Sequence, residues 1–398
     1  MKPIFIICFL SLAVVAAEDQ KDVELLFHMG NSRFTAKFFS EVAKINPDRS
    51  FVISPYSVMT PLAQLSIAAR ENTREQLWQA IGITTDEAVK LAFSHANTKV
   101  NSIKGVTLKT VSKIYLALNY DVFKDFGATT WETFGAAAQN IDFEKNEQAA
   151  NEINTWVEQN TNNRIKNLVS PDSLGQDTRA LLVNAIYFKG SWETQFDKTL
   201  TRERDFHINK AETKKVDMMH RRGNYKYTES AVLKSQIIEI PYKGDETSLV
   251  VVLPRDIEGI KEVQEVLKDS TVLDNALNDL RTQEVDLSLP TFKIETTTDL
   301  KDILRKMNVT EIFDPHVARL DYLIRVKGNM YISSAVQKAF IEVNEEGAEA
   351  AASNVFNIVV DSLTIGPKYH PVFNADRPFY FVLKMNSEPL FSGVMYAK

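Results

Sequence analysis

The chain has 398 residues, a net charge of −6 at neutral pH and a single cysteine. A negative balance argues against a nucleic-acid-binding protein, because phosphate backbones are bound by a surplus of Lys and Arg. A chain of this length can bury a core large enough to be stable without disulfides.

The first residues have the layout of a secretory signal peptide. Lys2 precedes an apolar run over residues 4–15, and small residues end at Ala17. The run is too short to span a membrane, and no later stretch is long and apolar enough to do so. We therefore expect residues 1–17 to be cleaved and residues 18–398 to be secreted. Cys8 lies in the cleaved part, so the mature chain would have no thiol and no disulfide.

The first half of the mature chain is predicted to be mainly helical. Apolar residues at helical spacing predict a helix from Phe27 to Val42. A Ser-Pro start precedes a second predicted helix, Ser57 to Ala69, and a polar run at residues 160–163 ends a third, Asn146 to Gln159.

Strands dominate the second half. Short apolar runs predict strands at Leu181–Phe188, Ile237–Tyr242, Ser248–Leu253, Val285–Leu289 and Phe379–Lys384. Several are apolar on both faces, which is typical of strands inside a large sheet. Helices followed by strands indicate an α+β protein, and the absence of a Pro/Gly/Ser-rich linker favours a single domain.

The chain carries no motif for catalysis. We find no G-x-S-x-G, H-E-x-x-H or G-x-x-x-x-G-K-[ST] sequence and no cysteine nucleophile in the mature chain. The six histidines are scattered without metal-ligand spacing. A catalytic triad is spatial, so spacing alone does not test for one. We predict no catalytic residue, no metal and no cofactor.

Basic residues do not gather into a clear polyanion site. We interpret Lys214-Lys215 and the run 220–222 as solvated loops. A polyanion cofactor is unsupported, because the lysines of the segment 99–113 are spread out along it, at Lys99, Lys104, Lys109 and Lys113. The sequon Asn308-Val309-Thr310 predicts glycosylation at Asn308.

A mixed segment near the C-terminus runs from Glu345 to Leu363. With a period of two, one face is almost wholly apolar, beginning with alanines and ending with Phe356, Ile358 and Val360, while the other face holds the charge. Inserted into a sheet, these three side chains would each contribute roughly 1.5–3 kcal/mol. An alanine-rich helix that leads into a strand is an equal alternative on the pattern alone.

Several segments, in this order, resemble the serpin family. They are Phe51–Val58, Val183–Trp192, Gln337–Asn344, the C-terminal run Phe373–Phe381, and a hinge formed by Glu345, Glu346, Gly347, Ala348, Glu349, Ala350, Ala351 and Ala352. The resemblance covers nearly all of the mature chain and is greatest to insect haemolymph serpins.

The resemblance implies a serpin fold: a single domain with a large central sheet, further sheets, about eight or nine helices and an exposed reactive-centre loop at about 345–367. It implies a secreted, monomeric inhibitor of a serine protease in a haemolymph-like fluid. In such inhibitors the protease cleaves the loop, and the loop then inserts into the main sheet and traps the acyl-enzyme. A non-inhibitory carrier with the same fold is the alternative, and the small hinge residues favour the inhibitor.

The family register places the cleaved bond at Asp361–Ser362. An aspartate before the bond asks for a protease pocket lined by Arg or Lys. Cleavage at Leu363 by a chymotrypsin-like enzyme, or at Val360 by an elastase-like enzyme, is the alternative.

The resemblance also implies a sheet-opening region at Ser54, Ser57, Asn184 and Gln337. Many serpins carry histidine at the position of Gln337. Glutamine can both donate and accept hydrogen bonds, so bonding there would survive, but a pH-responsive opening would not.

Overall fold

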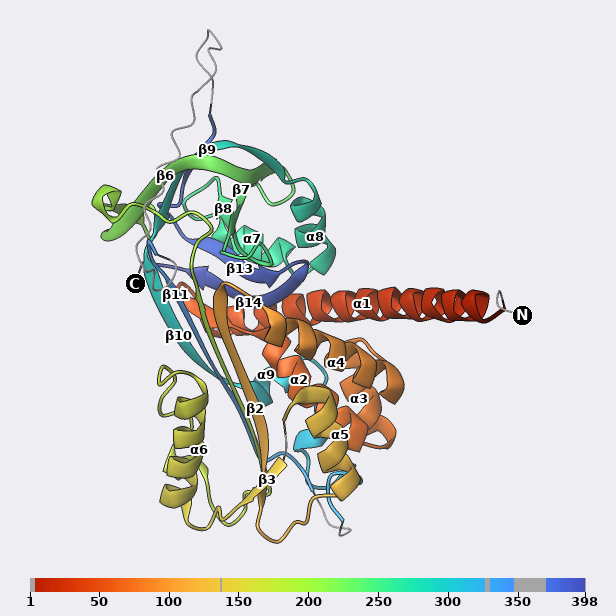
Figure 1. The fold of residues 1–398 in the computed structure, drawn as a ribbon. Helices are drawn as coiled ribbons and strands as arrows, with labels where there is room; N and C mark the ends of the chain where they lie inside the picture. The colour runs from red at the N-terminus through yellow and green to blue at the C-terminus, as the bar shows by residue number, and fades with distance from the viewer. Residues whose placement is uncertain (1–3, 137, 326–329, 347–369, 398) are drawn as a thin grey trace.

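The computed structural model describes residues 4–136, 138–325, 330–346 and 370–397, with side chains from Lys21 onward. Two sheets are surrounded by helices (Figure 1). The helices are α1 Ile4–Ile45, α2 Pro55–Ala68, α3 Glu71–Ile81, α4 Asp86–Ser102, α5 Lys124–Phe134, α6 Asn146–Asn160, α7 Ile260–Val266, α8 Ser270–Asn278 and α9 Leu300–Lys306. The strands are β1 Phe51–Ile53, β2 Val106–Ala117, β3 Ala138–Ile141, β4 Ala180–Gly190, β5 Arg202–His207, β6 Thr213–Ser230, β7 Ser235–Pro241, β8 Thr247–Pro254, β9 Arg281–Pro290, β10 Phe292–Asp299, β11 Ser334–Val343, β12 Val372–Asn374, β13 Phe379–Met385 and β14 Glu388–Met395.

The helices and strands predicted from periodicity are present. The predicted helices correspond to part of α1, to α2 and to α6, and the predicted strands to β4, β7, β8, β9 and β13. The boundaries differ by a few residues, except that α1 begins far before Phe27. Helix α6 ends where the chain turns into a left-handed backbone at Asn162 and Asn163, which asparagine tolerates better than most residues.

The larger sheet has the order β1-β14-β13-β8-β7-β6-β9-β12, with β5 paired to β6. Every residue of β8 is buried, so both faces of this strand are covered, and α7 packs on β8 and on its neighbour β13. This double covering explains why the predicted strands in this sheet are apolar on both faces.

The interpretation of the basic runs as loops was wrong. Lys214-Lys215 and residues 220–222 lie in β6, which pairs with β5 and β9. The charged side chains sit on solvated positions of antiparallel strands and pair across them: Lys215 Nζ lies 2.9 Å from Asp205 and Arg222 Nε lies 2.9 Å from Glu284. The charged residues at the solvated positions of β6 are therefore the reason that the sequence did not indicate a strand here.

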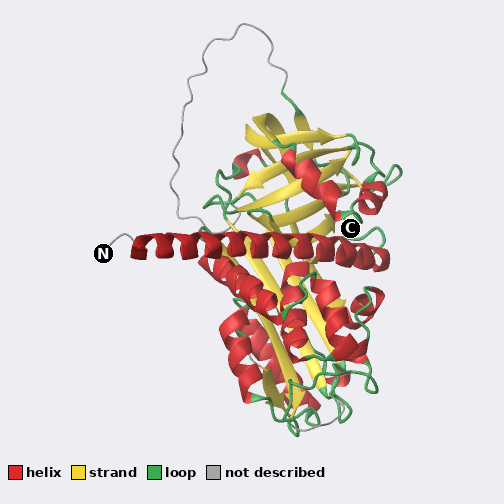
Figure 2. Cartoon of the chain, turned by 90° about the vertical axis from the view of Figure 1, so that its right-hand side faces the viewer, coloured by secondary structure: helices red, strands yellow, loops and turns green. Residues whose placement is uncertain are grey.

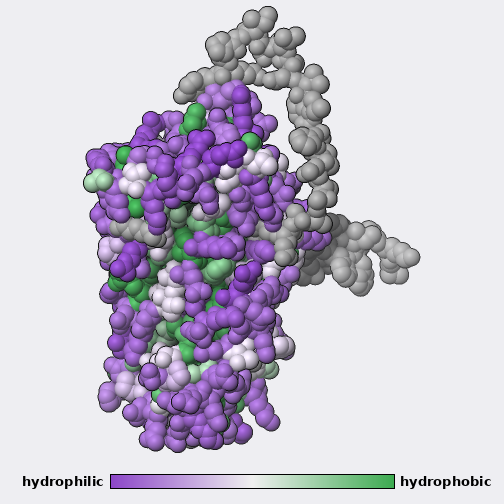
Figure 3. Space-filling view, turned by 90° about the vertical axis from the view of Figure 1, so that its left-hand side faces the viewer, coloured by the Kyte–Doolittle hydropathy of each residue, from purple (hydrophilic) through white to green (hydrophobic). Residues whose placement is uncertain are grey.

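The smaller sheet has the order β10-β11-β4-β2-β3 and lies between α6 on one side and α2, α4 and α5 on the other (Figure 1). Successive residues of β4 face opposite sides. Val183 and Tyr187 pack in a cluster with Ile153 of α6, whereas Ile186 and Phe188 belong to the main core. On the side that carries α6, apolar side chains form a band along the middle of the molecule between polar ends (Figure 3).

Helix α1 crosses the middle of the molecule, and its first turns project beyond it (Figure 2). The first buried side chain among those described is Phe27. Cleavage after Ala17, which stays a prediction, would therefore leave the described core contacts in place. No helix in the described part of the chain is long and apolar enough to cross a membrane.

Candidate functional site

The candidate site is the seam between β4 and β11, which lie side by side as parallel strands in the smaller sheet. Their register places Gln337 directly opposite Asn184. Both side chains are fully buried in strands whose other residues are mainly apolar. Such a polar pair is tolerated inside a protein only when its hydrogen-bonding groups find partners.

The start of α2 supplies those partners. Ser54 is the N-cap of α2, and Pro55 takes the first helical position, where its missing N–H costs nothing. The Ser54 hydroxyl accepts a hydrogen bond from Ser57 N at 3.3 Å and donates one to Leu390 O at 2.6 Å. The Ser-Pro start of the sequence therefore sets both serines at the seam.

Gln337 joins the two strands and the helix start. Its Nε2 lies 2.8 Å from both Ser54 O and Asn184 Oδ1, and 3.0 Å from Ser57 Oγ. Its Oε1 accepts from Ser54 N at 3.2 Å. The Ser57 hydroxyl donates to Asn184 Oδ1 at 2.7 Å, and Asn184 Nδ2 donates to Ser57 O at 2.9 Å. All four predicted residues thus meet in one buried cluster, here called the seam cluster, and none of them is titratable.

At the end of the seam, the segment after β11 is held by the chain that follows β4. Trp192 Nε1 donates to Asn344 O at 2.7 Å, and Phe196 N donates to Glu345 O at 3.0 Å. Trp192 stacks on Tyr242 with ring centroids 4.3 Å apart, which fixes its indole. These contacts secure the chain where the predicted loop begins.

The two described hinge residues also have side-chain partners. Thr201 Oγ1 donates to Glu345 Oε1 at 2.7 Å, and Glu346 forms an ion pair with Lys198. The hydrogen bond to Glu346 raises the pKa of the Lys198 ammonium group. The pair is exposed, so its contribution to stability is small. The remaining hinge residues Gly347–Ala352, the bond Asp361–Ser362 and the alternative sites Val360 and Leu363 lie outside the described residues.

Sequence reasoning did not identify the contacts at Phe196, Lys198 and Thr201. No local pattern marks these residues, because their role depends on β4 and β11 being neighbours. The other predicted positions are scattered. Asn308 is exposed just after α9, and its glycosylation stays a prediction. No group of three or more potential metal ligands occurs within the described part of the chain.

Comparison with known proteins identifies the family. Residues 29–397 match the family model described as serpin (serine protease inhibitor). The chain is 49% identical to antitrypsin of Bombyx mori over 393 residues, covering 98% of each chain, and 51% identical to antichymotrypsin-2 of the same insect over 370 residues, covering 92% of this chain and 97% of that protein. The structure of Serpin48 from Tenebrio molitor superposes with a TM-score of 0.84 at 34% identity, covering 94% of this chain and 99% of that chain.

These comparisons confirm the predicted serpin fold and the resemblance to insect serpins. Serpins that inhibit proteases are not enzymes, in agreement with the prediction from the missing motifs. The chain belongs to the serpin family.

Proposed function

We propose that the protein is a secreted inhibitor of a serine protease that acts as a suicide substrate. The protease would cleave the segment after the hinge and form an acyl-enzyme, and the freed segment would enter the seam between β4 and β11. The smaller, five-stranded sheet would therefore take the role that the resemblance assigns to the main sheet. The names of the Bombyx relatives, antitrypsin and antichymotrypsin, support an inhibitor as the function.

The observation that carries the proposal is the pairing of β11. One side of β11 is occupied by β10 in an antiparallel ladder, and the other by β4 in a parallel one. A segment that folds back after β11 runs antiparallel to β11 and, because the two strands are parallel, to β4 as well. It could therefore replace one parallel ladder with two antiparallel ladders, which are slightly more stable per residue.

The connection after β11 is long enough for this role. The chain from Asn344 to Pro371 links β11 to β12 in the other sheet, whereas connections in compact domains usually have about 4–6 residues. The even-numbered positions Ala348, Ala350 and Ala352 would enter the seam first and offer only small side chains to it. The apolar residues that follow on the same face would then be buried.

We further propose Asp361–Ser362 as the cleaved bond, which implies a protease with a basic pocket. Trypsin-like and chymotrypsin-like enzymes differ in their pockets, so the names of the relatives do not fix this choice. Cleavage after Val360 or Leu363 would retain the inhibitor and change its target.

The test is incubation of the mature protein with serine proteases of acidic, basic, aromatic and small-residue specificity. Intact-mass analysis should show a denaturant-stable complex and a released peptide that begins at Ser362. Ala350→Arg should be cleaved without forming the complex, because its charge would have to enter the sheet. Ala351→Arg is the matched control, since it changes the neighbouring alanine on the opposite face and should still form the complex.

Two results would overturn the proposal. If the wild-type loop is cleaved without a complex and without a gain in thermal stability, the protein is a substrate and the carrier function takes precedence. If Ala350→Arg inhibits as well as Ala351→Arg does, insertion through this face is wrong.

A further inference from the structure

The two-stranded ribbon formed by β5 and the first part of β6 separates its charges by face. Within the described residues β5 pairs only with β6, and their antiparallel register places Arg204 opposite Val216 and Phe206 opposite Lys214. Residues directly opposite each other point to the same side, and successive residues alternate. One face therefore carries three cations and no carboxylate, at Arg202, Arg204 and Lys214, whereas the other face carries the acidic residues Glu203, Asp205 and Asp217.

The three cations on the first face, here called the ribbon cations, have no counter-charge there. All three residues are exposed, and no described carboxylate lies within 4.0 Å of any of their charged groups. Arg202 and Arg204 are two residues apart on one strand, and Lys214 is the diagonal neighbour of Arg204, so adjacent cations start about 7 Å apart. On the opposite face, by contrast, Lys215 pairs with Asp205 at 2.9 Å. The cationic face is therefore complementary to a negatively charged surface outside the chain.

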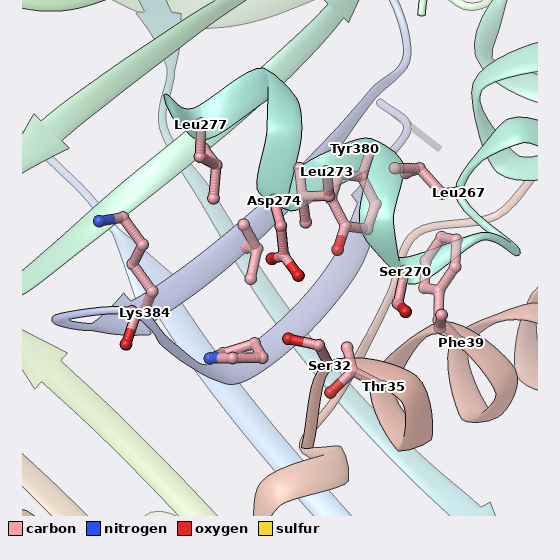
Figure 4. Close-up of a pocket in the computed structure, with 14 residues that line it drawn as sticks. Ser32, Thr35, Phe39, Leu267, Ser270, Leu273, Asp274, Leu277, Tyr380 and Lys384 are labelled. Carbon is pink, nitrogen blue, oxygen red and sulfur yellow. The ribbon is translucent and has the colours of Figure 1, made fainter. Parts of the chain in front are cut away.

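A lysine elsewhere in the molecule shows the compensated case. Lys384 borders the small cavity between α1, α8 and β13, together with Asp274 and Tyr380 (Figure 4). Its Nζ lies 3.0 Å from Glu239 Oε1, which also accepts a hydrogen bond from the Ser248 hydroxyl. The cavity holds about 30 Å³, which accommodates about one or two water molecules. Neither this lysine nor this cavity indicates an outside partner, whereas the ribbon cations do.

Strand β5 spans the space between the two ends of the segment that we propose is cleaved. Just before the segment, Glu345 accepts a hydrogen bond from Thr201 Oγ1 at 2.7 Å, and Thr201 directly precedes Arg202. Shortly after the segment, the carbonyl oxygen of Asp376 accepts a hydrogen bond from His207 N, at the other end of β5, at 2.7 Å. A protein that binds the segment between these two points must therefore approach β5.

We propose that the ribbon cations contact an acidic surface of the protease that attacks this segment, an inference that rests on the proposed function. A specific contact between proteins buries about 800 Å² on each partner, so the protease is expected to touch more than the residues beside the cleaved bond. The net charge of −6 opposes the approach of an acidic protease. Cations beside the docking point reverse this effect locally and raise the association rate. The ribbon cations thus select the protease by its surface charge, in addition to the selection by its pocket.

An anionic and a cationic trypsin are suitable probes, because they share a pocket specificity and differ in net charge. Asp361→Arg, introduced into every protein tested, provides a bond that both trypsins attack. The quantity measured is the second-order rate constant of attack, followed by release of the peptide that begins at Ser362. This rate constant is defined whether the protein inhibits the protease or is merely cleaved, so it does not depend on formation of the complex.

The ribbon variant combines Arg202→Gln, Arg204→Gln and Lys214→Gln. With anionic trypsin its rate constant should fall about tenfold at about 0.05 M salt and by less than about twofold at about 0.5 M salt, because salt screens charges on the surface. With cationic trypsin the rate constant should not fall.

The matched control removes three charges from exposed positions on α5, after α6 and on α9, where no described carboxylate is within ion-pair distance: Lys124→Gln, Arg164→Gln and Lys306→Gln. It should stay within about twofold of the unaltered ribbon under every condition. Thermal unfolding of each variant establishes that it is folded.

Three results would overturn the proposal. Equal rate constants for the ribbon variant and the control with anionic trypsin would show that the cations make no contact. An equal loss with both trypsins would show that the ribbon acts on the segment and not on the charge of the protease. Unchanged rate constants together with weaker retention of the ribbon variant on a sulfated-polysaccharide resin would assign the face to a polyanion. Cleavage without a stable complex refutes the proposed inhibitor instead, and a salt-dependent loss in the ribbon variant would still establish the contact.

Discussion

The hydrogen bonds of Gln337 should stabilise the uncleaved protein, and Gln337→Ala tests this directly. The substitution removes the acceptor of Ser54 N–H, which lies 3.2 Å from Gln337 Oε1 in a fully buried setting. Asn184 Oδ1 would still accept the hydrogen bond from the Ser57 hydroxyl, which lies 2.7 Å away. The net loss is therefore one orphaned buried donor and a small cavity, together about 3 kcal/mol.

The expected change in thermal midpoint follows from the size of the chain. An unfolding entropy of about 2.1 cal/mol/K per residue gives roughly 0.8 kcal/mol/K for the mature protein, so a loss of about 3 kcal/mol lowers the midpoint by about 4 °C. Differential scanning calorimetry of the uncleaved protein measures this shift. Gln283→Ala, at an exposed position in β9, serves as the control and should leave the midpoint within about 1 °C.

The isosteric Gln337→Glu makes the test sharper. It places an oxygen where Nε2 now donates to Ser54 O and Asn184 Oδ1. At pH 8 the variant should lose more stability than Gln337→Ala does, because a buried carboxylate would face two acceptors. A midpoint for Gln337→Ala equal to that of the wild type would refute the idea that the seam cluster stabilises the closed sheet.

Three further substitutions probe contacts outside the seam cluster. The hydrogen bond to Glu388 at 3.1 Å raises the pKa of His28 above 6.5. The stability that this contact contributes is complete below the pKa of His28 in the unfolded chain and is lost as pH rises through its pKa in the folded protein. The calorimetric midpoint should therefore fall from pH 6 to pH 8, and a fall of the same size in His28→Gln would contradict this. Trp192→Phe removes the indole donor 2.7 Å from Asn344 O and should cost about 2 kcal/mol of unfolding free energy; an unchanged midpoint would show that this contact is dispensable. Gly105 has φ +76°, and an added Cβ would lie 2.1 Å from the carbonyl oxygen of Lys243. Gly105→Ala should therefore lower the unfolding free energy by at least about 2 kcal/mol. A thermal midpoint at or above that of the wild type would exclude this strain.

The sequence predicts elements where the signal is local. The Ser-Pro start of α2 is a cap with its own geometry, and the apolar run of β4 reflects its burial on both faces. Strand β6 escaped prediction because its exposed positions carry charges such as Lys214 and Lys215. Alternation of charged and buried residues is weak evidence when the partner strand is unknown.

The site was predictable only in part, because its contacts join distant segments. The resemblance to serpins indicated Ser54, Ser57, Asn184 and Gln337, and the structure brings these residues together. The spacing of the lysines, by contrast, gave no sign that Lys113 differs from Lys109. The difference is tertiary: Trp156 of α6 covers Lys113, and Lys109 stays exposed.

The composition of the seam cluster suits the proposed mechanism. A seam held only by interlocking apolar side chains would lose that packing as the strands separate, with no local replacement. A seam held by amide and hydroxyl groups can exchange partners, because glutamine and asparagine each donate and accept. The cluster contains no titratable group, so its strength should not change with pH, in contrast to a cluster built around histidine. If the sheet opens as proposed, the trigger is therefore cleavage of the segment after Glu346 and not protonation at the seam.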